Sequence, residues 1–279
     1  MLRSPLEKIN ALYLRIFDSE FMRRILRNSS YLVSATVITA GIGFVQNYFR
    51  FQVLKPAGVG LLAAMAAFTN VINRFTAFRI DELVIKYVRL YIERKEPQKA
   101  AAVYKLAALL EAGGAILAFG LIYGLAPVGV QFFSDVSGVE ALFVLYGSLI
   151  NLTYDSSDGI LQVFNRFDAK SIIDVCQSLL RLGLTVWVFF SGGGLMEFIL
   201  AELAGRLLRS LAVIVLALRT AKREWGAGWW RTPISVLQSD RRSLLTFAFS
   251  TIMSATVSLV AKDSEDLWVN AFLGNVSGG

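Results

Sequence analysis

The chain has 279 residues, of which 55% are hydrophobic and 18% are charged, with a mean hydropathy of +0.56 and a net charge of +7. Soluble domains average about 25% charged residues, so this composition is that of a membrane protein and not of a soluble nucleic-acid-binding protein. His is absent and Cys176 is the single cysteine, which excludes imidazole bases, His-ligated metals and a disulfide within one chain. We therefore expect no metal, no cofactor and no enzyme.

Residues 1–28 form a charged segment that contains six Lys or Arg, with Ile9, Tyr13, Ile16 and Phe17 on roughly one face. This pattern predicts a weakly amphipathic helix at the cytoplasmic surface of a membrane. A solvated tail is an equal alternative.

Seven apolar stretches follow, each near the roughly 20 residues that a bilayer-spanning helix needs. They predict an all-α, polytopic membrane protein with a six-helix transmembrane lobe at 29–219, a linker at 220–242 and the first helix of a second lobe at 243–279. The predicted spans are Ser30–Tyr48, Val59–Phe78, Ala100–Val128, Ala141–Phe164, Ile172–Phe190, Leu195–Leu218 and Leu244–Val269.

The stretch from Val59 to Lys105 begins as an uncharged apolar run and then becomes rich in Lys and Arg. Its basic part keeps apolar residues at helical spacing, from Ile80 to Tyr91. This pattern predicts a helix that leaves the bilayer and continues along its cytoplasmic surface.

The basic residues gather in the connections on one side of the predicted membrane. Residues 1–29, 79–105 and 219–242 hold most of the 28 Lys and Arg, whereas the loops after the third and fifth spans have none. The positive-inside rule then places the N-terminus in the cytoplasm. We also assign the linker, with its Pro233 and three Trp, to the cytoplasmic side.

Polar residues recur at helical steps within the spans, as in Asn151, Asp155, Asp158 and Gln162 of the fourth. Charge at membrane depth is costly and normally faces a bundle interior or a watery cavity. Two interpretations stay open: ion pairs between or along helices, such as Glu202–Arg206 and Lys262–Asp266, or an aqueous central cavity. The candidate cavity residues are Arg50, Arg74, Asn151, Asp155, Asp158, Arg181, Glu202, Arg206 and Arg209.

The cations among these polar residues of the first six predicted spans are Arg. A guanidinium stays charged when buried and binds phosphate in a bidentate way. This favours an anionic, phosphate-bearing substrate. Asp155 and Asp158 would instead suit a cation or a cycling proton. Glu111 in the third span is either a partner of another group or a proton-coupling residue, so the ion-coupling candidates are Glu111, Asp155 and Asp158.

The chain resembles the polysaccharide biosynthesis and O-antigen-unit flippase branch of the MOP exporter superfamily, across residues 20–279. The residues that carry the resemblance are RRILRNSSYLVSATVITAGIGFVQNYFRFQVL (23–54), KPAGVGLL (55–62), IDELVIKYVRLYIER (80–94) and the segment 239–279, with Asp263 and Asp266 ahead of FLG. Phe249 stands where the family's helix-breaking Pro is expected, which is a departure from the pattern.

The resemblance implies 12 to 14 helices in two six-helix lobes, a MATE-like architecture that works by alternating access. It implies flipping of a polyprenyl-diphosphate-linked oligosaccharide across the cytoplasmic membrane, with other cell-envelope polysaccharide assembly proteins as further partners. The chain holds one lobe and one further helix, so we expect either a fragment or a half-length product. The rivals are a multidrug and cation antiporter of the same superfamily, a membrane-embedded enzyme, which the short outward loops disfavour, and a non-transporting scaffold.

Overall fold

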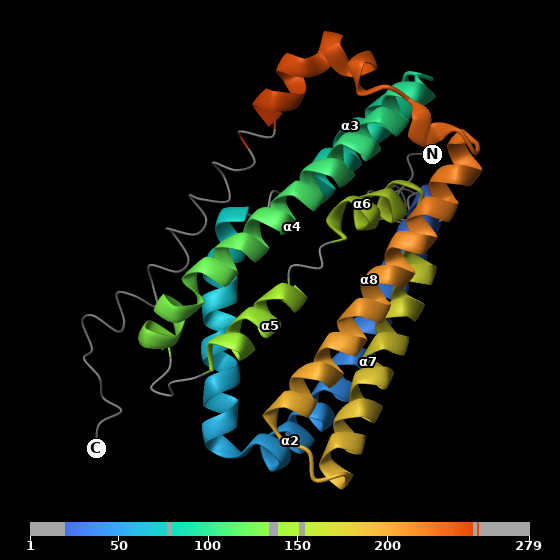
Figure 1. Cartoon of the computed structure of the whole chain (residues 1–279). Coiled ribbons are helices and arrows are strands. Elements are labelled where there is room, and N and C mark those ends of the chain that lie inside the picture. Colours follow the sequence, from blue (N-terminus) through green and yellow to red (C-terminus); the bar gives the residue numbers. More distant parts are fainter. Residues whose placement is uncertain (1–19, 77–79, 134–138, 151–153, 248–249, 251–279) are drawn as a thin grey trace, which may run out of the picture.

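The computed structural model describes residues 20–76, 80–133, 139–150, 154–247 and 250, and it is a bundle of helices without a strand in those segments (Figure 1). Three stretches of these helices are long and apolar enough to cross a membrane: Ser29–Asn73, Pro97–Gln131 and Phe167–Phe190. The expectation of an all-α membrane protein is confirmed. The helices are α2 (Glu20–Thr76), α3 (Ile80–Glu93), α4 (Pro97–Phe133), α5 (Glu140–Ile150), α6 (Asp155–Val163), α7 (Phe167–Phe190) and α8 (Leu195–Trp225).

Helix α2 consists of two arms that meet at Lys55, whose φ of 54° and ψ of 174° are not helical. Pro56 follows at once, and a proline disfavours helical geometry in the residue before it. In Figure 1 the first arm runs to this bend and the second arm returns from it. The bend therefore separates the first two predicted spans.

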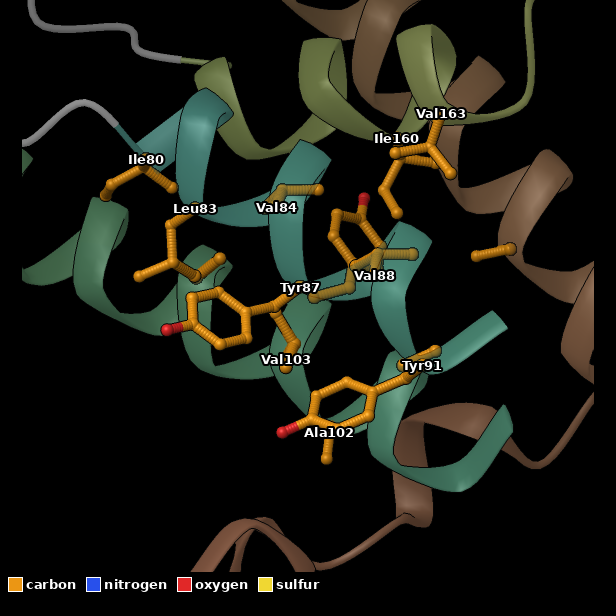
Figure 2. Close-up of a cluster of buried hydrophobic side chains, with 14 of the residues drawn as sticks. Ile80, Leu83, Val84, Tyr87, Val88, Tyr91, Ala102, Val103, Ile160 and Val163 are labelled. Atoms are coloured by element: carbon orange, nitrogen blue, oxygen red, sulfur yellow. The ribbon is translucent and has the colours of Figure 1, made fainter. Parts of the chain in front are cut away.

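Helix α3 differs from the expected helix along the membrane surface. The α2 helix ends at Thr76, and α3 is followed by a turn at Lys95, where φ is positive at 59°, before α4 starts. The predicted apolar face exists, but it packs against α4 and α6 inside the bundle (Figure 2). The predicted helical periodicity was correct, but the apolar face of α3 contacts other helices of the same chain instead of a lipid surface.

The fourth predicted span, Ala141–Phe164, is not one continuous helix. Helix α5 ends at Ile150 and α6 begins at Asp155. The sequence Asp155-Ser-Ser-Asp158 favours a helix start, because short polar side chains compete for backbone hydrogen bonds within a helix and suit its first turn. The break leaves the first N–H groups of α6 in need of acceptors.

Two apolar cores hold the helices together. One core joins α3, α4, α6 and the end of α8, with Val84, Val88 and Ile160 fully buried (Figure 2). The other core joins the second arm of α2 with α4, α5 and the start of α8, around Met65 and Phe143. The outward faces of α2, α4 and α7 remain apolar and exposed, as lipid-facing helices require.

The segment after α8 folds back over the ends of α3 and α4 through two short 3₁₀ helices, η1 (Trp229–Arg231) and η2 (Ile234–Asp240). Lys99 of α4 donates to Asp240 at 3.1 Å, and Lys105 donates to the Thr232 carbonyl at 3.3 Å. Leu237 is buried beneath them. A new helix starts at residues 241–247, whereas most of the seventh predicted span lies outside the described residues.

Candidate functional site

Three helices each contribute an i, i+4 pair of polar residues to one cluster. The pairs are Gln46 and Arg50 on α2, Arg181 and Thr185 on α7, and Glu202 and Arg206 on α8. Residues four apart lie on one face of a helix, so each pair presents both side chains together. We call these six residues the arginine–glutamate cluster.

Glu202 is the centre of the cluster, and its side chain is 6% exposed. Its Oε1 atom lies 2.5 Å from Arg181 Nη2, 3.4 Å from Arg50 Nη2 and 3.1 Å from Gln46 Nε2. Arg206, the i+4 neighbour, is farther away, with Nε 3.8 Å from Oε2. The expected Glu202–Arg206 pair is therefore present, but the shortest ion pair joins α8 to α7.

The cluster carries three guanidinium groups against one carboxylate, so its positive charge is not balanced within it. The Nε–H groups of Arg50 and Arg181 are buried and have no hydrogen-bond acceptor in the described part of the chain. Tyr146 of α5 lies in the electrostatic field of all four charged groups, and the Phe198 ring lies 5.2 Å from the Arg50 guanidinium carbon. The arrangement can bind an anion beside an aromatic wall.

Gly205 makes the approach of Arg181 to α8 possible. A Cβ atom at position 205 would lie 2.3 Å from Cγ and 3.0 Å from Cδ of Arg181. The aliphatic stem of Arg181 thus crosses α8 at the one place in that turn where no side chain stands. Glycine serves here for close approach and not for unusual backbone geometry.

A second set of ion pairs joins α6, α7 and α8 nearer the start of α7 and the end of α8. Arg209 Nε is 2.7 Å from Asp174 Oδ1, and its guanidinium lies 4.6 Å from the centre of the Tyr154 ring. Lys170 Nζ is 2.6 Å from Asp158 Oδ2, which also accepts from Gln162 at 3.1 Å. These pairs are neutral, and they join neighbouring helices.

Glu111 of α4 accepts hydrogen bonds from the start of α6. The backbone N–H groups of Asp155 and Ser156 lie 2.5 and 3.1 Å from its two carboxylate oxygens, and the Ser156 hydroxyl also bonds to it. The sequence left open whether Glu111 has a protein partner. In the structure its partner is the first turn of α6.

The candidates from sequence therefore fall into separate places. Arg50, Arg181, Glu202 and Arg206 come together, whereas the four others that are described lie near α6: Glu111, Asp155, Asp158 and Arg209. Asn151 and the side chain of Arg74 are outside the described residues.

Sequence reasoning did not select Tyr146, Thr185 or Lys170 as site residues. The i+4 spacing of Thr185 from Arg181 was a usable signal. Tyr146 is uncharged and had none.

Two hollows in the described part of the chain lie away from the arginine–glutamate cluster. One, of about 440 Å³, is lined by Leu106, η2 residues and Leu244, and the other, of about 350 Å³, lies between α3 and Trp225. Each has one basic residue in its lining, Arg241 in the first and Lys95 beside Glu224 in the second, and neither gathers several guanidinium groups as the cluster does. Among the described residues no group of three or more Asp, Glu or Cys is placed to hold a metal ion.

Comparison with known proteins gives a family match and one distant relative. The family model described as polysaccharide biosynthesis protein matches residues 25–279. The inner membrane protein YghQ of Escherichia coli (strain K12) is 28% identical over 184 residues, which cover 63% of this chain and 50% of that protein. The chain thus spans about half the length of the curated relative that it matches. No solved structure matches the chain.

Proposed function

The chain belongs to the polysaccharide biosynthesis protein family, and from this membership we propose that it moves lipid-linked oligosaccharide or polysaccharide repeat units across the cytoplasmic membrane. In this proposal the chain acts by alternating access and catalyses no covalent reaction. Because the chain spans about half the length of its relative, the complete transport cycle belongs to this proposal and not to the comparison.

The observation that carries the proposal is the excess of positive charge around Glu202. Arg50, Arg181 and Arg206 surround one carboxylate, and two buried Nε–H donors of these side chains lack an acceptor in the described segments. A buried donor without an acceptor is costly. A ligand with anionic oxygens, such as a diphosphate, would satisfy both the charge and the donors.

The diphosphate of a polyprenyl-linked sugar has the chemistry that this cluster fits. Its oxygens would compete with Glu202 for the guanidinium groups, so Glu202 would hold the arginines in place while the site is empty. The polyprenyl tail would remain in lipid beside the apolar outer faces of α2 and α7. The sugar repeat unit would lie toward the interior of the complete transporter.

A cation antiporter is the second candidate function, and the acidic groups near α6 are the observation that bears on it. Asp158 is already paired with Lys170, and Asp174 with Arg209. Glu111 faces backbone donors. Because Asp158, Asp174 and Glu111 each have a partner, these three carboxylates are less suited to a cationic drug than the arginine–glutamate cluster is to an anion.

Binding of a short-chain polyprenyl diphosphate to the purified chain in detergent tests the proposal. Arg181→Gln and Arg50→Gln should each weaken binding by about ten- to hundredfold, since hydrogen bonds to charged groups contribute roughly 1.5–3 kcal/mol. Arg181→Lys should fall between, because Lys keeps the charge and loses the planar fork. Arg219→Gln, an exposed change on the same helix as Glu202, is the matched control. Equal affinity in all four variants would contradict the assignment.

A transport assay then addresses the repeat unit itself. Membrane vesicles that contain the complete transporter would be supplied with the lipid-linked oligosaccharide on the cytoplasmic face. The rate at which the headgroup appears on the other face should fall from the unmodified chain to Arg181→Lys and then to Arg181→Gln, in the same order as the binding affinity. Binding without any dependence of transport on Arg181 would place the anion site outside the transport path.

A further inference from the structure

The hollow between α4 and η2 lies where the surface of α4 changes from charged to apolar. Lys105 donates to the Thr232 carbonyl of the linker at 3.3 Å. Leu106 follows it and lines the hollow, and on the next turn Leu109 and Leu110 are exposed. Lys side chains suit the headgroup level of a membrane and exposed Leu side chains suit the lipid tails. The hollow is therefore placed where these two regions meet.

The walls of the hollow are mostly apolar. They include Leu106 of α4, Ile234 and Leu237 of η2, and Leu244 and Leu245 of the helix that starts at residue 241. The volume of about 440 Å³ falls within the range of roughly 300–1,000 Å³ that is usual for small-ligand sites. Leu245 is 57% exposed, so this wall is open to its surroundings. At the edge of a membrane such a surface suits an acyl chain.

Arg241 is the basic residue in the lining of this hollow, and it is exposed. It forms no ion pair with another residue in the part of the chain that the structure describes. The adjacent carboxylate, Asp240, instead accepts from Lys99 at 3.1 Å. Gln238 adds an amide to the same lining. A guanidinium beside an apolar hollow can bind a phosphate group whose attached chain lies in the hollow.

The charge of the two hollows differs, and this difference selects the kind of lipid. In the second hollow Lys95 and Glu224 both belong to the lining, so their charges offset each other. In the first, the charge of Arg241 is not offset by an acid of the lining. A phosphodiester has a single negative charge, which one guanidinium can balance, whereas a diphosphate has more and suits the three guanidinium groups of the arginine–glutamate cluster. A zwitterionic headgroup brings its own cation and gains less from Arg241.

We propose that this hollow binds one anionic glycerophospholipid from the leaflet beside the linker. The phosphate pairs with Arg241, and an acyl chain lies over Leu106 and Leu245. The lipid joins η2 to α4 from the membrane side, in addition to the hydrogen bond between Lys99 and Asp240. This site is separate from the arginine–glutamate cluster and does not depend on the proposed transport function.

Competition between two phospholipids tests the proposal. The whole chain is purified in detergent, stripped of lipid and mixed with equal amounts of phosphatidylglycerol and phosphatidylethanolamine that have the same acyl chains. Native mass spectrometry then measures how much of each lipid the chain retains. The unmodified chain should retain phosphatidylglycerol about fivefold over phosphatidylethanolamine, since one basic residue near the membrane surface favours an anionic lipid by about that factor.

Three exposed positions provide the variants. Arg241→Gln should bring the retention of the two lipids close to equal. Lys95→Gln removes the same amount of charge from the second hollow and, as the control, should keep the preference. Leu245→Ser should lower the retention of both lipids, because it removes part of the apolar wall.

A second measurement locates the lipid. Phosphatidylglycerol with a photoactivatable diazirine in its acyl chain is incorporated into vesicles that contain the whole chain. Illumination should label the peptides that contain Leu106 and Leu245. Labelling of other peptides alone would overturn the assignment of the hollow.

The retention experiment can also overturn the proposal. Equal retention of both lipids by the unmodified chain, or an unchanged preference in Arg241→Gln, contradicts a lipid site at Arg241. An equal loss of preference in Lys95→Gln would assign the effect to net charge and not to this hollow. Retention of neither lipid by a dimeric chain would assign the surface to a second copy.

A competition with short-chain polyprenyl diphosphate separates this site from the transport proposal. At equal concentration it should leave phosphatidylglycerol bound, and Arg241→Gln should leave diphosphate affinity unchanged. Displacement of phosphatidylglycerol from the unmodified chain would overturn the phospholipid assignment and give the hollow to the transported lipid.

Discussion

Glu202 is buried among three Arg side chains, so removal of its charge should destabilise the chain more than removal of an exposed negative charge on the same helix. Glu202→Gln would leave three guanidinium groups without their shared counter-ion and would weaken the contact between α7 and α8. We expect the variant to be less stable by about 3–5 kcal/mol, the usual effect of breaking a buried ion pair. Thermal unfolding of the purified chain in detergent measures this.

The matched control is Glu224→Gln, an exposed acid on the same helix. Its substitution should change stability by less than about 0.5 kcal/mol, as for most surface positions. If both variants unfold at the same temperature, Glu202 is not the counter-ion on which the cluster depends.

Gly205 offers a second residue-scale test, because it changes the cluster without touching a charge. In Gly205→Ala the new methyl group would overlap the stem of Arg181, 2.3 Å from its Cγ atom. Arg181 must then move away from Glu202, at a cost of about 1–3 kcal/mol for an overpacked site. Diphosphate affinity should fall together with stability.

Gly183→Ala on α7 is the control for helix propensity, since a Cβ atom there meets nothing within 4 Å. Replacing that glycine should leave stability unchanged or raise it by about 0.5–1 kcal/mol. Equal effects of the two alanines in thermal unfolding would show that Gly205 gives no room to Arg181.

At the scale of elements, the segment η1–η2 is held to α4 by a pH-dependent contact. The hydrogen bond from Lys99 holds the pKa of Asp240 below its ordinary value. A lowered folded-state pKa stabilises docking at every pH above the ordinary value of about 3.9, and this contribution is lost as the pH falls below it.

Hydrogen exchange of residues 234–240, compared between the unmodified chain and Asp240→Asn at the same pH, measures this contact. The variant should exchange faster at neutral pH, and the difference should shrink as the pH falls below about 4 and vanish once the pH is below the lowered pKa of Asp240. Ser235→Ala, an exposed change in the same 3₁₀ helix, is the control and should exchange nearly like the unmodified chain. A difference that persists in acid would assign the contact to something other than the Asp240 charge.

The sequence predicts helices well and their partners poorly. Apolar runs located α4, α7 and α8, and the gap between the first two predicted spans contains the bend in α2, because these signals are local. The break before α6 was missed, since a stripe such as Asp155, Asp158 and Gln162 keeps the same spacing in a short helix. The apolar face of α3 was found, but periodicity does not tell a lipid surface from a protein core.

The same limit applies to the candidate site. Arg50, Arg181 and Glu202 were selected because buried charge in a membrane is costly, and that argument needs no structure. That Arg181 rather than Arg206 is the closest partner of Glu202 depends on the pairing of α7 with α8 and on the space above Gly205. Such pairings join residues far apart in the sequence, and spacing along one helix cannot specify them.

At the scale of the whole molecule, the positions of the basic residues predict the orientation of the chain in the membrane. The described linker, the end of α3 and the start of α4 lie together, and they are basic. The turn between α7 and α8, at Ser191 and Gly192, lies at the opposite ends of those helices and carries no Lys or Arg. From the positive-inside rule we therefore predict that the linker lies in the cytoplasm and the turn on the outer side.

Thiol accessibility in whole cells tests this orientation. In a Cys176→Ser background, Ser191→Cys should react with a membrane-impermeant maleimide in intact cells, because that position is exposed at the outer turn. Ala227→Cys, exposed in the linker, should react only after the membrane is permeabilised. The reverse pattern would invert the topology, and the arginine–glutamate cluster would then have to receive its anion from the outer side. Reaction of both thiols in intact cells would show that the chain does not separate the two faces as its charge pattern requires.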